Sequence, residues 1–274
     1  MRWPWVLGAA ALGTLPSTSF TRAPNDDPFT WPELRRGLRQ RQRRDRHLHR
    51  FMEHAAFQLE RLYSEFEQRK HLPNESARFR ASLEYAEHTI SDRATRIMYP
   101  GVSNTEERNS FLRQYGCTAW TDEAMHEIVS RSPIVQYSAG AGQWALEAAQ
   151  RGADVVALDD GRGPALEGQQ PVYPVRRAET KALALYRPRT LLLVYPQRDT
   201  AEQALASHFG ETIIYIGEGR GGANASESFF DTLSRHYNVE RRVDVHPFAG
   251  GLEKMFVLRR REETEEQAAL MGKV

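Results

Sequence analysis

The residues best placed to do chemistry lie between positions 133 and 160. An apolar run at 133–135 leads into a turn of small side chains: Ser138, Ala139, Gly140, Ala141 and Gly142. A helical pattern follows, and a second apolar run ends in two acids, Asp159 and Asp160. Such a turn lets backbone NH groups approach a ligand, the helix N-terminus favours negative charge, and the acid accepts hydrogen bonds from ribose hydroxyls. This stretch therefore predicts a strand, turn, helix and strand unit that binds a nucleoside cofactor.

The turn alone does not say which nucleoside cofactor it binds. Residues 140–145 satisfy the dinucleotide pattern G-x-G-x-x-A, with Asp159 about twenty residues further on, as that pattern requires. The C-terminal end of the domain distinguishes a dinucleotide-binding sheet from another kind of nucleoside-binding sheet. Apolar strands at 243–246 and 255–258 are joined by residues 247–254 only, which is too short for a helical crossover. The last two strands are therefore predicted to be antiparallel neighbours, whereas a dinucleotide-binding sheet normally continues with parallel crossovers.

The elements that must position this turn alternate between strand and helix. Two short helices are expected before the first strand, at 105–115 with Asn104 as N-cap and after the N-cap Thr121. After Asp160 the pattern predicts strands and helices in turn: strands at 172–175, 190–195 and 212–216, and helices at 200–208 and 226–237. This alternation predicts an α/β domain, over residues 104–261, with a mostly parallel sheet covered on both faces.

A helical extension is predicted over residues 25–103. Apolar residues recur every three to four positions across 48–66 and again across 79–97, which is typical of two amphipathic helices forming a hairpin. One interpretation is a packing extension that covers the main domain. The other is an arm, helices 46–97, that binds a protein partner, with the arginines of 35–50 meeting an acidic surface or RNA phosphates. Aromatic residues are absent from 35–50, which disfavours nucleic acid.

Composition excludes few functions. The chain has 274 residues and a formal net charge of +1, so its overall charge indicates no polyanionic partner. Cys117 is the only cysteine, so neither an intrachain disulfide nor a cysteine-based metal site can form. His47 and His49 project from roughly opposite faces of a helix, which is poor geometry for chelation, and no metal site is predicted.

The two ends of the chain are predicted to lie outside the folded domain. Residues 3–15 are apolar, follow Arg2 and give way to small polar residues. This segment is too short to span a bilayer comfortably and resembles the apolar region of a signal peptide. A mitochondrial or plastid presequence and a disordered end are the other interpretations of residues 1–24. No transmembrane helix is predicted in the mature domain, and residues 262–274 are a charged tail.

Over residues 108–260 the sequence resembles the class I S-adenosylmethionine-dependent methyltransferases. The residues that carry the resemblance are the turn at 135–142, the acid Asp159 and the strand with its aromatic-proline end at 191–197. A poorly characterised branch is most similar, through the segment at 215–218 and a glycine pair before the last strand. The resemblance implies a Rossmann-like sheet with a terminal antiparallel strand. It also implies that the turn cradles the methionine part of the cofactor and that Asp159 binds the ribose.

Site residues are predicted on both sides of the reaction, partly from the resemblance and partly from their places at strand ends and before the first strand. The cofactor-binding set is Gln136, Ser138, Ala139, Gly140, Ala141, Gly142, Asp159, Asp160 and Trp120. The catalytic, substrate-side set lies at the ends of predicted strands: Tyr195, Pro196, Gln197 and Glu218. Two positions depart from the family pattern, because Gln136 replaces an acid and Ser138 replaces the first glycine.

Three functions follow from these residues. The first is an S-adenosylmethionine-dependent methyltransferase of unknown acceptor, which Gly140, Gly142 and Asp159 favour. The second is a methyltransferase-like domain without catalysis that serves as a binding or assembly component, which Gln136 and Ser138 favour. The third is a nicotinamide-dependent oxidoreductase.

Overall fold

A computed structural model describes residues 27–161 and 170–262, apart from the side chains of 73–75. The predicted leader at 1–24 and the tail beyond 262 lie outside the described residues. Among the described residues no helix is long and apolar enough to cross a membrane. Nor do they contain a cluster of histidine, cysteine and acidic side chains that could hold a metal ion.

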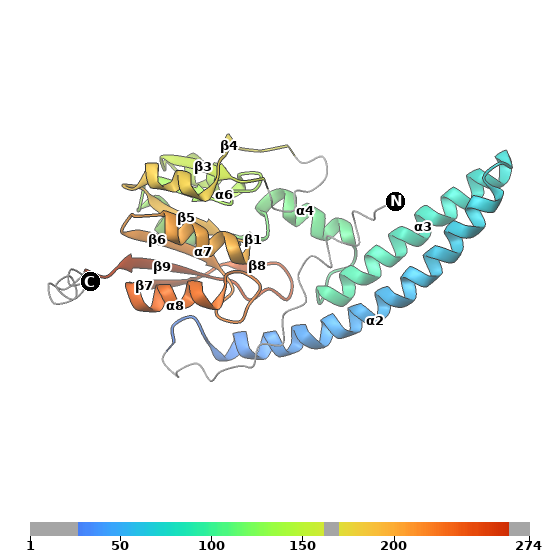
Figure 1. The fold of residues 1–274 in the computed structure, drawn as a ribbon, viewed down its shortest axis with the longest axis horizontal. Coiled ribbons are helices and arrows are strands. Elements are labelled where there is room, and N and C mark those ends of the chain that lie inside the picture. The colour runs from blue at the N-terminus through green and yellow to red at the C-terminus, as the bar shows by residue number, and fades with distance from the viewer. Residues whose placement is uncertain (1–26, 162–169, 263–274) are drawn as a thin grey trace, which may run out of the picture.

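A sheet of seven strands forms the centre of the α/β domain (Figure 1), in the order β4-β3-β2-β5-β6-β9-β7. Five of the strands are parallel: β2 (Ile134–Tyr137), β3 (Val155–Asp159), β4 (Val175–Arg177), β5 (Thr190–Val194) and β6 (Thr212–Gly217). β9 (Lys254–Arg260) lies antiparallel between β6 and β7 (Tyr237–Asp244). The sheet is thus mostly parallel with one antiparallel strand near its edge, which confirms the predicted α/β, Rossmann-like fold and the antiparallel pairing of the last two strands.

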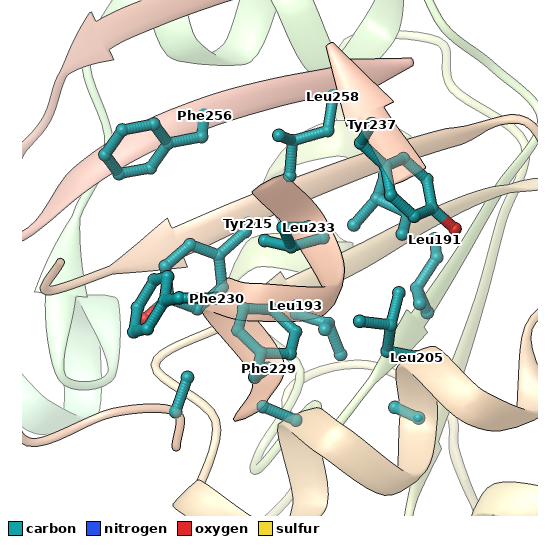
Figure 2. Close-up of a cluster of buried hydrophobic side chains, with 14 of the residues drawn as sticks. Leu191, Leu193, Leu205, Tyr215, Phe229, Phe230, Leu233, Tyr237, Phe256 and Leu258 are labelled. Carbon is teal, nitrogen blue, oxygen red and sulfur yellow. The ribbon is translucent and has the colours of Figure 1, made fainter. Parts of the chain in front are cut away.

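Helices cover both faces of the sheet. On one face α7 (Arg198–Ser207) and α8 (Glu227–His236) pack on the strands, and the 3-10 helix η1 (Thr180–Tyr186) lies against α7. Figure 2 shows Phe229, Phe230 and Leu233 of α8 packed around the strand residues Tyr215 and Leu193. On the other face α5 (Asp122–Val129) and α6 (Gln143–Gln150) bury a second cluster. Strand side chains alternate between the two clusters, which explains why β5 and β6 are apolar along most of their length.

The short helices before the first strand form as their caps predict. α4 (Thr105–Tyr115) begins where the Asn104 side chain accepts a hydrogen bond from the Glu107 NH at 2.9 Å, and it ends at Gly116. At the start of α5 the Thr121 hydroxyl accepts a bond from the Ala124 NH at 3.1 Å. Between these helices β1 (Thr118–Ala119) pairs with β8 (His246–Pro247). Local capping chemistry therefore determined these boundaries.

The predicted helical hairpin is present, with a longer first helix than the pattern indicated. α2 (Pro32–Arg69) begins well before position 48 and includes the whole arginine-rich segment, and it packs against α3 (Pro73–Met98). Its first turns belong to the core of the domain, because Phe29, Trp31, Leu34 and Leu38 are buried with sheet residues. Beyond them the paired helices project away from the sheet (Figure 1). We call the projecting part, residues 42–98, the arm; the boundary predicted at 104 stays a prediction.

Two predicted strands were misplaced. The strand expected at 243–246 is instead the longer β7 at Tyr237–Asp244, and His246 belongs to β8, which pairs with β1. The strand expected at 172–175 is instead β4 at Val175–Arg177, and residues 170–174 form an irregular segment beside the small-residue turn. The Val172 NH donates to the Ala141 carbonyl at 2.8 Å, and the Tyr173 hydroxyl donates to the Val155 carbonyl at 3.0 Å. These bonds hold the segment against the turn and β3, so the Val172 NH is used there rather than in a sheet ladder.

Candidate functional site

The candidate site lies where the connections from two adjacent central strands leave in opposite directions. The chain passes from β2 to β3 on one side, and from β5 to β6 on the other. Ser138 follows β2 with φ 59°, and Tyr195 follows β5 with φ 48°. A side chain other than glycine in this left-handed region costs about 1–3 kcal/mol and persists only where the surroundings impose it. Two such residues therefore mark the crevice in which open α/β sheets bind ligands.

The two glycines of the turn have different roles. Gly142 is the N-cap of α6 with φ 87°, and a Cβ there would lie 2.8 Å from the Cβ of Tyr173. Glycine is therefore required at 142 both by the backbone and by the close approach of the 170–174 segment. Gly140 has φ 58°, but a Cβ there would meet no atom of the described residues within 4 Å. With respect to those residues Gly140 borders open space, as expected of a residue over which a ligand passes.

Asp159 braces the turn from the end of β3. One carboxylate oxygen accepts the Gly140 NH at 2.9 Å, and the other accepts the Gly161 NH at 2.7 Å. Each carboxylate oxygen has a second lone pair, so the group can still accept bonds from a ligand. The pattern that predicted a ribose-binding acid thus also identified the residue that fixes the shape of the turn.

Asp160 lines a cleft of about 580 Å³ beyond the ends of β3 and β4. Its other lining residues are Arg177, Ala178, Glu179, Thr180 and Gln203. The volume falls within the range of about 300–1,000 Å³ that small-molecule and cofactor sites occupy. Asp160 therefore lies in a cleft of cofactor size, next in sequence to the acid that braces the turn.

Trp120, predicted as part of the cofactor site, lies in an aromatic stack outside the turn. Its ring is 5.1 Å from Tyr115 and 5.5 Å from Trp144 between centroids, with both pairs edge to face. It lines a separate cleft of about 380 Å³ together with Asp122 and His246. The start of α6 is also held by α4, because the Gln143 side-chain amide donates to the Leu112 carbonyl at 3.1 Å.

Glu218, predicted on the substrate side, is fully buried and ion-paired. The Arg41 guanidinium of α2 donates to both of its carboxylate oxygens, with Nη1 2.6 Å from Oε2. The Ala223 NH donates to Oε2 at 2.8 Å as well. Glu218 therefore joins the helical extension to the end of β6. Sequence reasoning found the acid but not its partner, since nothing in the local spacing pairs residues so far apart.

Other charged residues that sequence reasoning missed gather beside this ion pair. Glu253 has 6% exposure, and its Oε2 is buried without a hydrogen-bond partner among the described residues. Burial, and then the negative charge of Glu218, raise the pKa of Glu253 to about 8, which Arg41 and Arg108 partly oppose. We call Arg41, Arg108, Glu218 and Glu253 the acid–arginine cluster.

The flanks of the acid–arginine cluster are aromatic and polar. The Arg108 guanidinium carbon lies 4.6 Å from the centroid of Phe248 and 5.0 Å from that of Tyr99. Burial raises the pKa of the Tyr195 hydroxyl well above its usual value, and the charge of Glu253 adds to this shift. Burial also raises the pKa of the Cys117 thiol, against the charge of Arg108. The structure thus brings Tyr195 and Glu218 into one electrostatic environment, as their assignment to a common site requires.

Comparisons with known proteins gave similarity to solved structures alone. No family model and no curated protein sequence matches the chain. Among solved structures it is similar to magnesium protoporphyrin IX methyltransferase (ChlM) from Synechocystis PCC 6803 with bound SAM, at 15% identity over 65% of this chain and 94% of that chain, with TM-score 0.40. The mitomycin 7-O-methyltransferase MmcR has 14% identity over 76% of this chain and 67% of that one, with TM-score 0.32. A mutant of MtNAS has 12% identity over 85% and 100%, with TM-score 0.38.

Proposed function

We propose that this chain binds S-adenosylmethionine at the C-terminal edge of its sheet and transfers the methyl group to an acceptor. The observation that supports this most directly is the arrangement at the junction of β2 and β5. A glycine turn is braced by Asp159 and open at Gly140, in a sheet with the class I methyltransferase strand order. Asp160, the next residue after the bracing acid, lines a cleft of about 580 Å³.

The residues around the turn fit the chemistry of this cofactor. Gln136 has 1% exposure, and its side-chain carbonyl oxygen has no partner among the described residues. A buried acceptor without a donor is costly, and the ammonium group of the methionine part would supply one. Asp159 and Asp160 offer acceptors for ribose hydroxyls. Glutamine in place of an acid at 136 thus keeps the hydrogen-bond acceptor and loses the charge.

When bound, S-adenosylmethionine supplies a methyl group on a positively charged sulfur. The chain itself must hold the acceptor in line and take up its proton. Glu253 suits the second task, because its Oε2 is unpaired among the described residues and its pKa of about 8 lies close to neutral pH. Tyr195, at the end of β5, lies between the turn and this carboxylate in the order of strands. We assign positioning of the acceptor to Tyr195 and proton uptake to Glu253.

A binding or assembly component without catalysis is the second candidate. The observation that favours it is the ion pair of Glu218 with Arg41, since it occupies a residue assigned to the substrate side with a contact from the helical extension. A nicotinamide-dependent oxidoreductase is disfavoured, because β9 lies antiparallel within the sheet.

The experiment is a thermal shift of the full chain with S-adenosylhomocysteine, S-adenosylmethionine or NADH. Ligand at about one hundred times its dissociation constant adds about 2.7 kcal/mol of stability. We expect both sulfur compounds to raise the melting temperature, and Asp160→Asn to reduce that rise. Asp122→Asn, in the other cleft, is the matched control and should leave it unchanged. No rise for a folded protein would refute cofactor binding; a rise without methyl transfer to any acceptor would favour the second candidate.

A further inference from the structure

One face of α2 carries a row of exposed arginines that the proposed reaction does not use. Their spacing of three and four residues places them on a single face of the helix. They are Arg36, Arg39, Arg43, Arg46 and Arg50, and we call them the arginine stripe. All five side chains are exposed. Within the part of the chain that the structure describes, none of them forms an ion pair or hydrogen bond. The stripe is therefore a concentrated and unneutralised positive charge.

The same face continues along the arm with residues that suit a nucleic-acid ligand. His54, Phe57 and Arg61 extend the row at the same spacing, and all three are exposed. Phe57 is 68% exposed, so its ring is accessible to a ligand that lies along this face.

The acidic residues of α2 do not neutralise the face that carries the arginine stripe. Between Arg36 and Arg61 the helix contains Asp45, Glu53 and Glu60. The helical positions of Asp45 and Glu60 lie outside the face, and Glu53 at its edge contacts His49, with 3.3 Å between carboxylate and ring nitrogen. At the far end Arg61 is paired with Glu65, with 3.4 Å between Nε and the carboxylate, so the unneutralised positive charge of the face lies between Arg36 and Arg50.

The geometry of the stripe matches a chain of phosphates. At 1.5 Å per residue, the arginines from 36 to 50 extend over about 21 Å, with roughly one guanidinium per helical turn. Guanidinium groups bind phosphate oxygens in a bidentate manner, and the segment 35–50 contains arginine but no lysine. A regular row of guanidiniums therefore fits a repeating phosphodiester better than a single anionic group.

The uncharged residues of the face distinguish among polyanions. A membrane surface requires apolar side chains interleaved with the basic ones, and none lies on this face between Arg36 and His54. An acidic protein surface would use the arginines but give Phe57 no specific role. Unpaired bases stack on exposed aromatic rings, so Phe57 at the end of the stripe favours a single strand over a duplex.

We propose that this face of α2 binds a single-stranded polynucleotide, with the phosphates on the arginine stripe and a base stacked on Phe57. The overall charge of +1 conceals this site, because the acids that balance the arginines lie elsewhere. The proposal is independent of the proposed methyl transfer and needs no cofactor.

The test is fluorescence anisotropy of a labelled oligouridylate of about twenty nucleotides with the full chain over a range of salt. Five phosphate contacts at about 0.7 per contact predict a slope of log affinity against log salt near −3.5. Substituting Arg39, Arg43 and Arg46 by Gln should weaken binding at least tenfold at about 100 mM salt and reduce the slope by about 2. Phe57→Ala should weaken binding several-fold and leave the slope unchanged, because Phe57 contacts no phosphate.

The control substitutes Arg78, Arg80 and Arg187 by Gln, three exposed arginines outside the stripe. It removes the same charge and should change affinity and slope far less. Three results would overturn the proposal: no binding by the unaltered chain, equal effects of the stripe and control variants, or competition by polyglutamate or duplex as strong as by the single strand. Circular dichroism on each variant establishes that α2 remains helical.

Discussion

At the scale of single residues, the site contains side chains in conformations or environments that cost stability. Ser138 and Tyr195 have positive φ, and Glu253 is buried beside Glu218 with one oxygen unpaired among the described residues. Such costs are tolerated where the surrounding structure imposes them, and they concentrate at functional sites. The residues at the ends of β2 and β5 therefore differ from the core, where most buried side chains are apolar.

Ser138→Gly should stabilise the protein by about 1 kcal/mol, because glycine adopts the left-handed region without strain. The structure gives Ser138 φ 59°. Chemical denaturation measures the free energy of unfolding. The control is Ser130→Gly, since Ser130 has φ −64° and its hydroxyl donates to the Glu127 carbonyl. We expect that variant to be destabilised, and an equal effect of the two substitutions would contradict the assignment of strain to Ser138.

His208 should make stability depend on pH below neutrality. Burial and the charge of Arg260 lower its pKa from 6.5 to about 4. Between these values the unfolded chain binds more protons than the folded one, so stability is lost as pH falls from about 6.5 towards 4, by up to about 3 kcal/mol. In urea denaturation at several pH values, His208→Leu should flatten this dependence. The exposed His236→Leu serves as the control and should leave the slope unchanged.

At the scale of elements, α2 is attached to the sheet by a buried ion pair as well as by its apolar first turns. The side chain of Arg41 is 17% exposed and that of Glu218 is 0% exposed, and Leu34 and Leu38 of the same helix are buried in the core. Removing one partner of such a pair leaves an uncompensated charge, whereas removing both can be nearly neutral. Removing either Arg41 or Glu218 alone should therefore lower the free energy of unfolding strongly, whereas removing both should lower it much less.

A double-mutant cycle tests this dependence. Arg41→Met or Glu218→Gln alone should cost about 3–5 kcal/mol, and the double variant much less than the sum. The matched control is the exposed pair Arg259 and Glu211, with side-chain exposures of 52% and 72%. Its coupling should lie within about 1 kcal/mol of zero. Additive costs for Arg41 and Glu218 would show that the two residues act separately.

At the scale of the whole molecule, the sheet domain and the arm differ in how much apolar surface they bury. Every residue of β5 is buried, whereas the buried apolar residues of the arm are Ala55, Leu59, Leu83, Ala94 and Met98. Segments with few buried contacts open at lower free energy than the core. The arm is therefore expected to fluctuate while the domain stays folded, which would let it adapt to a flexible partner.

Native-state hydrogen exchange measures this difference directly. Amides of α2 beyond Arg50 and of the first half of α3 should exchange at a lower free energy of opening than those of β5 and β6. The control is the amides of α7 and α8, which pack on the sheet. Their free energy of opening should equal that of the strand amides. Equal protection in the arm and in the strands would mean that the molecule unfolds as one unit.

The sequence by itself determined the features that depend on local chemistry. Small residues between an apolar run and Asp159 specify the turn, because they allow a tight backbone beside a helix N-terminus. Asn104 and Thr121 specify two helix starts, because their side chains accept backbone bonds three residues on. The short connection at 247–254 specifies antiparallel strands. The spacing of the arginine stripe is likewise readable in the sequence.

Only the tertiary structure decided which distant residues meet. Arg41 and Glu218 are 177 positions apart, and no periodicity relates them. Glu253 and Arg108 come from separate elements, and burial beside another carboxylate, which no local pattern encodes, gives Glu253 its pKa. The same holds for the arm, because exposure and the absence of partners depend on what packs against a helix. Local sequence fixes backbone conformation through nearby bonds, whereas electrostatic environments arise only when the chain brings remote charges together.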